Sequence, residues 1–289
     1  MSTRPSPRTL TVQSSQRLSP SMIRITLGGD ELRDFPTGFA GGYVKLILSP
    51  PTATSKAVIR TYTIRHQRSD AIDVDFALHG GEAAGPATRW ALSAKPGDTV
   101  LVGGPGLPKP LSQGRDFYLV AGDMTALPAI SVNLSALPAN ARGLGVIEIQ
   151  DEADRPDIIA PEGMQIRWLI NPEPGRHPDL LVDALRSIGQ PEGKIAAWAA
   201  CEFTSMRKLR DYLRGQMGLG GDDLYISSYW KHGLIEDEHK EIKRADADAQ
   251  LVSCLHERPI EKGRTVRPAL FAERSVRIRT RNPSRLHSC

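Results

Sequence analysis

The sequence predicts a protein of two domains, an antiparallel β-barrel followed by an α/β domain built on a parallel sheet. The chain has 289 residues, which is enough for two hydrophobic cores. Short strand-like runs separated by Gly and Pro fill residues 9–110, a pattern typical of a small barrel. From Asp116 onward, apolar runs alternate with helix-like stretches, which indicates βαβ crossovers.

The first domain is expected at residues 8–112. Pro86 suits the first turn of a helix, so a helix is expected over residues 87–93. The run Gly-Gly-Pro-Gly at 103–106 is a strong turn signal near the end of the domain. Its strands are expected at residues 9–17, 22–28, 43–49, 59–65, 71–78 and 99–103.

The second domain is expected at residues 113–233, followed by a charged helix at 234–250 and a basic tail at 251–289. Its strands are expected at residues 117–121, 145–149, 166–170, 194–200 and 224–228. Its helices are expected at residues 125–136, 180–187 and 204–217.

Charge is unevenly distributed along the chain. The net charge is +4, but residues 252–289 hold eight Arg and one Lys against three Glu, which leaves the rest at −2. A basic tail can bind nucleic acid, but we favour a solvated extension and expect no nucleic-acid partner.

Several classes of protein are disfavoured by composition. No apolar run of about 18 residues is found, so we expect no membrane span, and the N-terminus lacks the apolar stretch of a signal peptide. Three widely spaced cysteines argue against an iron–sulfur or structural zinc site. We expect a cytoplasmic monomer.

The stretch Arg60-Thr-Tyr-Thr-Ile-Arg65 carries unusual hydrogen-bonding capacity for a strand. Alternation places Arg60, Tyr62 and Ile64 on one face, and Thr61, Thr63 and Arg65 on the other. A planar guanidinium binds phosphate well, so this strand is expected to grip a flat, phosphate-bearing ligand.

Two further segments suit the binding of phosphate groups. In the run from His79-Gly80 to Trp90, the helix that opens at Pro86, Ala87 and Thr88 offers free N–H groups to an anion. In Ala121-Gly122-Asp123-Met124-Thr125, a strand turns into a helix, with Thr125 as the expected N-cap. Trp90 is expected to serve in core packing. The general dinucleotide fingerprint Gly-x-Gly-x-x-Gly is absent.

The last motifs follow the expected strands 194–200 and 224–228. They are Trp198-Ala-Ala-Cys201-Glu202, and Tyr229-Trp230 with the later Glu-Asp-Glu-His run that ends at His239. Cys201 is expected to be a small apolar residue rather than a nucleophile. His239 is expected in a structural helix rather than a metal site.

Together these segments resemble the siderophore-interacting protein family, FAD-dependent ferric-siderophore reductases of the ferredoxin-reductase-like superfamily. The resemblance covers residues 8–250 and implies a flavin-binding barrel and an NAD(P)H-binding α/β domain. Three positions depart from the family pattern: Thr88 replaces Ser, Met124 replaces a frequent Glu, and Cys201 replaces Gly.

By resemblance, FAD is bound by the barrel, with Thr63 at flavin N5 and Tyr62 at the ring or ribityl chain. The other cofactor-binding residues implied are Arg60, Arg65, His79, Gly80, Ala87, Thr88, Gly122, Asp123, Thr125, Glu202 and Trp230. The substrate-binding candidates are Lys45, Lys231 and Lys240, and no metal site in the protein is expected.

The implied activity is reduction of a ferric siderophore with NADH or NADPH as electron donor. A carboxylate near Asp151 favours NADH slightly, although the nearby Arg155 can accommodate a 2′-phosphate. Two alternatives remain. One is a flavin reductase of the same fold with a quinone, free flavin or ferredoxin partner, and the other is a non-catalytic binder of ferric chelates or nucleic acid.

Overall fold

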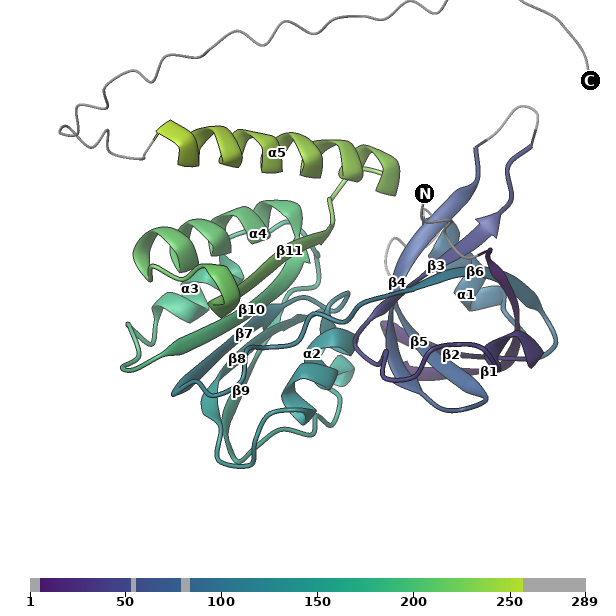
Figure 1. The fold of residues 1–289 in the computed structure, drawn as a ribbon, viewed down its shortest axis with the longest axis horizontal. Helices are drawn as coiled ribbons and strands as arrows, with labels where there is room; N and C mark the ends of the chain where they lie inside the picture. Colours follow the sequence, from purple (N-terminus) through teal and green to yellow (C-terminus); the bar gives the residue numbers. More distant parts are fainter. Residues whose placement is uncertain (1–5, 53–55, 79–83, 257–289) are drawn as a thin grey trace, which may run out of the picture. The chain divides into compact units, whose positions relative to one another are not determined.

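A computed structural model describes residues 6–52, 56–78 and 84–256. The described chain divides into two units, with the boundary after Ala245. The first unit contains both the barrel and the α/β sheet (Figure 1). No helix among the described residues is long and apolar enough to cross a membrane.

The first half of the chain forms a closed barrel with the strand order β1-β2-β5-β4-β3-β6. Alternate side chains point inward, so residues such as Leu46, Ile64 and Phe76 are fully buried. Helix α1 (Pro86–Ser93) adds Ala87 and Ala91 to the same core. The strands are β1 (Arg8–Ser19), β2 (Met22–Gly28), β3 (Tyr43–Ser49), β4 (Val58–Gln67), β5 (Ala71–Ala77) and β6 (Thr99–Gly106).

The second half forms a five-stranded parallel sheet with the order β11-β10-β7-β8-β9. Helix α2 (Leu127–Ser135) covers one face, and α3 (Leu180–Arg186) and α4 (Phe203–Arg210) cover the other (Figure 1). The strands are β7 (Phe117–Gly122), β8 (Arg142–Ile149), β9 (Gly163–Ile170), β10 (Ile195–Glu202) and β11 (Leu224–Trp230).

This architecture confirms the predicted fold class. The strand order runs from β7 to β8 and β9 in one direction, and from β7 to β10 and β11 in the other. Ligands of open α/β sheets bind where the order reverses, outside the carboxyl ends of the strands. That point lies at the ends of β7 and β10, after Gly122 and Glu202.

Helix ends differ in part from the prediction. Thr125 is not the N-cap of α2, which begins at Leu127 with Ala126 in the cap position. The N–H and hydroxyl of Thr125 instead donate to Asp123 Oδ1, at 2.9 and 2.5 Å. After α4, residues Asp211–Gln216 form a π-helix. Helix α5 (Glu236–His256) runs past the predicted end at residue 250.

Buried polar contacts join the barrel to the α/β domain. Asp154, which is almost fully buried, accepts hydrogen bonds at Oδ1 from the Ser19 hydroxyl and the Ser21 N–H, both at 2.7 Å. The amide of Gln150 donates to the Leu78 carbonyl at 2.9 Å. Because Gln150 follows β8 directly, these contacts hold the carboxyl edge of the sheet beside the barrel.

Candidate functional site

The side chains of β4 alternate between the barrel core and its exterior. Ile64 is fully buried inside, and the Tyr62 ring rests on Phe76 with centroids 4.2 Å apart. Phe76 in turn contacts Trp90 at 5.6 Å, so Trp90 packs against the core as predicted. Burial raises the pKa of the Tyr62 phenol. The Tyr62 side chain is therefore held in place by packing and stays uncharged.

Arg60 lies on the same side of β4 and is largely buried. Its Nη1 donates to the Ile59 carbonyl at 2.9 Å, and its Nε lies 3.8 Å from Oε2 of Glu236 in the first turn of α5. A guanidinium carries five N–H donors, so these two contacts leave donors for an anion. The geometry therefore suits the predicted role of Arg60 in phosphate binding.

The opposite side of β4 faces outward beside β3. Tyr43 pairs with Thr63 across the two strands, and Lys45 pairs with Thr61. Thr63 is nearly buried, whereas Tyr43, Lys45 and Thr61 are exposed. Among the residues that the structure describes, Lys45 has no charged partner. This face thus presents hydroxyls and one uncompensated cation.

The amino end of α1 supplies the second anion-binding element predicted for the barrel. Gly85 occupies the N-cap position, and no side chain of the described residues caps the helix. Ala87 and Thr88, both buried, form the first turn with Pro86. Free N–H groups at a helix start favour phosphate. His79 and Gly80, the other predicted residues here, lie outside the described residues.

Arg65, the remaining predicted flavin residue on β4, lies in a different environment. The pairing of β4 with β5 shifts register between Ile64 and His66. Burial lowers the pKa of the Arg65 guanidinium, and the carboxylate of Asp75 on β5 opposes that change. Arg65 is therefore held among the charges of β2 and β5, where Arg24 and Asp75 form an ion pair at 2.6 Å.

Asp123 organises the carboxyl edge of the parallel sheet. Its Oδ1 accepts both hydrogen bonds from Thr125, and its Oδ2 accepts from the Glu202 N–H and the Trp230 indole, each at 2.8 Å. Burial raises the pKa of Asp123, and the hydrogen bonds act in the opposite direction. One carboxylate thus joins the ends of β7, β10 and β11.

Gly122, beside Asp123, is required by packing. A Cβ at this position would lie 2.6 Å from the Ala200 carbonyl oxygen and 2.8 Å from Ile130 Cδ1. The close approach of β10 and α2 therefore excludes any side chain here. The glycine allows the strand-to-helix turn that the sequence predicted as a dinucleotide site.

Glu202 is the second buried carboxylate at this edge. Its Oε2 accepts from the N–H groups of Thr204 and Ser205, which caps α4. Its Oε1 accepts from Lys231 Nζ at 3.0 Å and from the His232 N–H at 3.2 Å. Lys231 was predicted to bind substrate, but its charge is compensated by Glu202.

Glu148, at the end of β8, is the third carboxylate of this edge. Burial raises its pKa to about 7, and the negative charges of Asp123 and Glu202 add to the rise. The Asn171 amide donates to Glu148 Oε1 at 2.9 Å, and this hydrogen bond opposes the rise in pKa. Glu148 and Asp123 line a narrow hollow together with Thr125, Pro174 and Trp230.

Replacing Glu148 with glutamine is expected to change how stability depends on pH. A carboxyl whose pKa is raised by folding stabilises the fold at low pH and loses that contribution as pH rises through its folded pKa. Wild type should therefore lose this contribution to the free energy of unfolding between about pH 5 and 8. In Glu148→Gln the side-chain oxygen can still accept from Asn171, but the amide does not titrate. Its free energy of unfolding should therefore not show this loss as pH rises. Urea unfolding at both pH values tests this, and parallel pH profiles would contradict it.

The other residues singled out in the sequence lie in surroundings that indicate a structural role. Cys201 is fully buried in the core that includes Phe203, and burial raises its pKa, so it is an apolar residue as predicted. The His239 imidazole contacts the Ser228 hydroxyl at 2.8 Å, and burial lowers its pKa to about 4. Among the described residues, no group of His, Cys, Asp and Glu is arranged to hold a metal ion.

Lys240, the third lysine predicted to bind substrate, lies on α5. Its Nζ is 3.0 Å from Glu236 Oε1 and 3.4 Å from Asp237 Oδ1. Sequence reasoning did not assign a site role to Glu236, which also contacts Arg60 and Thr61. Only the Glu-Asp-Glu-His motif signalled it, because its barrel partners lie about 175 residues away along the chain.

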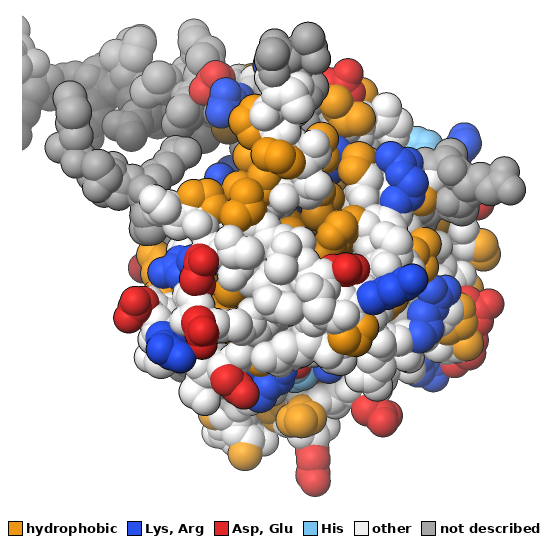
Figure 2. Space-filling view, turned by 90° about the vertical axis from the view of Figure 1, so that its right-hand side faces the viewer, with side chains coloured by type: hydrophobic (Ala, Val, Ile, Leu, Met, Phe, Trp, Pro, Cys, Tyr) orange, Lys and Arg blue, Asp and Glu red, His pale blue; other side chains and the backbone are white. Residues whose placement is uncertain are grey.

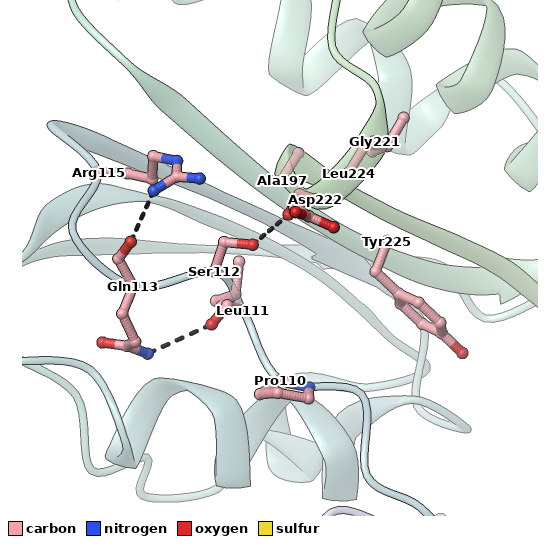
Figure 3. A pocket seen from close by; sticks show the side chains of 10 residues that line it. All are labelled: Pro110, Leu111, Ser112, Gln113, Arg115, Ala197, Gly221, Asp222, Leu224 and Tyr225. Atoms are coloured by element: carbon pink, nitrogen blue, oxygen red, sulfur yellow. Dashed lines mark hydrogen bonds between the residues drawn. The ribbon is translucent and has the colours of Figure 1, made fainter.

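Another hollow, of about 490 Å³, lies away from these residues, near the amino ends of β10 and β11 (Figure 3). Arg115 at its rim is paired with Asp223 at 2.6 Å, and Ser112 donates to the Asp222 carbonyl. Its polar groups are thus largely engaged with one another. On the barrel face shown in Figure 2, basic and acidic side chains are interspersed.

Comparison with known proteins agrees with this arrangement. The model of the siderophore-interacting FAD-binding domain matches residues 11–58 and 49–109, and that of the siderophore-interacting protein matches 115–233. Ferric vibriobactin reductase ViuB of Vibrio cholerae is 33% identical over 264 residues, covering 84% of this chain and 96% of ViuB.

Two more relatives support the same assignment. The crystal structure of the siderophore-interacting protein SipS from Aeromonas hydrophila is 33% identical with a TM-score of 0.75, covering 84% of this chain and 98% of SipS. The NADPH-dependent ferric-chelate reductase of Escherichia coli is 28% identical, covering 70% of this chain and 84% of that protein. The chain therefore belongs to the siderophore-interacting protein family, with a siderophore-interacting FAD-binding domain at its barrel.

Proposed function

We propose that this chain is a ferric-siderophore reductase that takes electrons from NADH or NADPH and uses FAD as its cofactor. The observation that carries the proposal is the pairing of two anion-binding elements in a matched FAD-binding domain. These are the Arg60 guanidinium on β4 and the start of α1, which no side chain of the described residues caps. Both suit the pyrophosphate of FAD.

The barrel residues have the side-chain chemistry that binding of a flavin would require. Arg60 and the first turn at Ala87 and Thr88 would hold the pyrophosphate, and Tyr62 would contact the ring or the ribityl chain. Thr63 would hydrogen-bond the reactive edge, since its hydroxyl lies on the outward side of β4. When bound, FAD would supply the conversion of the electron pair of one hydride into single electrons, which ferric iron requires.

The nicotinamide dinucleotide would bind at the carboxyl edge of the sheet, near Asp123, Thr125 and Trp230. Asp123 fixes the Trp230 indole there. Three buried carboxylates, Asp123, Glu148 and Glu202, lie at this edge, and Lys231 forms an ion pair with Glu202. We infer that Trp230 and this edge orient the nicotinamide.

The substrate would approach the outward face of β3 and β4. Lys45, which has no charged partner among the described residues, supplies a positive charge there, beside Thr61. The charges of Lys231 and Lys240 are engaged with Glu202 and Glu236, so Lys45 is the first candidate for attracting an anionic chelate. Reduction of the iron weakens its binding by hard oxygen ligands, which releases it.

An anaerobic assay tests the proposal. The purified chain is incubated with FAD, freed of excess flavin, and mixed with NADH or NADPH and an Fe(III) tris-hydroxamate or tris-catecholate, with a ferrous trap present. We expect a flavin spectrum, bleaching by at least one nicotinamide, and ferrous product. A quinone or free flavin reduced in place of both chelates would favour the alternative of a different flavin reductase.

Deleting residues 257–289 is expected to leave reduction of the chelate within about twofold of wild type, which corresponds to less than half a kilocalorie per mole. The recognisable family region ends before this basic segment, and the site described above lies within residues 43–240. Steady-state rates of both proteins at low and physiological salt provide the check. A large fall at either salt concentration would mean that the tail recruits the chelate or another partner.

A further inference from the structure

We propose that Glu236, in the first turn of α5, is a positioning residue that holds the Arg60 guanidinium for the flavin pyrophosphate. This rests on the proposed binding of FAD to the barrel. It adds a role for a residue of α5, which lies outside the barrel.

The ion pair between Glu236 and Arg60 is shielded from water. The two side chains are only 15% and 18% exposed, and Glu236 Oε2 lies 3.8 Å from Arg60 Nε. On its other side, Arg60 Nη1 donates to the Ile59 carbonyl at 2.9 Å. A hydrogen bond to a carbonyl and an ion pair with a carboxylate therefore restrict the rotation of the guanidinium, and neither contact involves Nη2.

The Glu236 carboxylate is itself held in place. Its Oε1 accepts from the Thr61 hydroxyl at 3.2 Å and lies 3.0 Å from Lys240 Nζ. Its negative charge also adds to the rise in the pKa of Tyr62 that burial causes. One carboxylate thus acts on Arg60, Thr61 and Tyr62, three consecutive residues of β4.

The start of α5 is anchored on the α/β domain by side chains beyond Glu236. The His239 imidazole contacts the Ser228 hydroxyl at 2.8 Å. Lys243 Nζ donates to the Ser227 hydroxyl at 2.7 Å and to the Ser228 carbonyl at 2.8 Å. The position of Glu236 is therefore set by β11, so α5 connects the edge of the α/β sheet to the flavin strand of the barrel.

The distances argue against a different role, in which Glu236 occupies the place of the pyrophosphate and competes with FAD. A substitute anion would lie closest to the arginine. The carboxylate instead lies closer to Lys240 and Thr61 than to Arg60. A neighbouring carboxylate that locks the rotamer of a binding residue pre-organises the site and reduces the cost of binding.

The test is a measurement of the FAD dissociation constant on the full-length chain freed of flavin, by quenching of flavin fluorescence. Glu236→Gln keeps the shape of the side chain but removes the charge, and is expected to weaken FAD binding about tenfold. The shorter carboxylate of Glu236→Asp should recover part of the loss. The matched control is Asp237→Asn, because Asp237 also contacts Lys240 but no residue of 60–62. It should bind FAD as wild type does.

A double-mutant cycle separates positioning of Arg60 from a general role in docking α5. If Glu236 acts through Arg60, Glu236→Gln should cause no further loss of FAD affinity in an Arg60→Ala background. An equal loss in both backgrounds, or no loss in the wild-type background, would overturn the inference. Tighter binding by Glu236→Gln would show a competing anion instead. Failure of wild type to bind FAD would refute the proposed function itself.

Discussion

Replacing Arg60 with alanine is expected to lower the affinity for FAD by about two orders of magnitude. A bidentate, charge-assisted contact with a phosphate contributes a few kilocalories per mole when it is shielded from water, and about 2.7 kcal/mol corresponds to a hundredfold. Arg60 is largely buried and held by Ile59 and Glu236, so little ordering cost opposes the contact. Flavin fluorescence titration of the chain freed of flavin gives the affinity directly.

Arg33→Ala is the matched control for this variant. Arg33 belongs to the same barrel but is exposed and forms a surface pair with Asp30 at 2.8 Å. Its removal should leave FAD affinity unchanged, because surface ion pairs contribute little free energy and Arg33 lies outside β4. Equal FAD affinity of Arg60→Ala and Arg33→Ala would show that Arg60 does not bind the pyrophosphate.

Replacing Asp123 with alanine is expected to lower the free energy of unfolding by about 3 to 5 kcal/mol. The carboxylate accepts four hydrogen bonds, from Thr125, Glu202 and Trp230, in an almost fully buried position. Alanine would leave those donors without an acceptor and would open a cavity between three strand ends. Urea unfolding, followed by tryptophan fluorescence, measures the loss and also reports on Trp230.

Asp123→Asn should recover only part of this loss. An amide oxygen can accept from Thr125, but the amide nitrogen would then face two other donors, the Glu202 N–H and the Trp230 indole. The control is Asp183→Ala, which removes an exposed carboxylate paired with Arg186 and should change stability far less. If all three variants unfold at the same urea concentration, Asp123 does not organise the edge of the sheet.

The fold was predictable because the strands and helices of each domain correspond to regular patterns of apolar and polar residues in the sequence. Alternation placed Ile64 and Thr61 on opposite faces of their strand, and in the structure Ile64 is buried inside the barrel whereas Thr61 is exposed. Apolar runs such as 117–121 and 194–200 are the central strands β7 and β10. These features depend on neighbours in the chain or on burial alone, and local sequence reports both.

The site was only partly predictable, because side chains choose partners that lie far apart in the sequence. Asp123 accepts hydrogen bonds from the Glu202 N–H and the Trp230 indole, which lie 79 and 107 residues away along the chain. Lys231 and Lys240 were predicted to bind substrate, yet they form ion pairs with Glu202 and Glu236. Charge counted along a chain does not show which charges meet in space.

The most direct test of the central claim is a single anaerobic turnover. The chain with bound FAD is reduced by one equivalent of NADH or NADPH and mixed rapidly with an Fe(III) tris-hydroxamate, while the flavin spectrum and a ferrous trap are recorded. We expect the flavin spectrum to return to its oxidised form as two ferrous ions appear for each flavin, which balances a two-electron donor against one-electron acceptors. Flavin that stays reduced in the presence of excess ferric chelate would contradict the account.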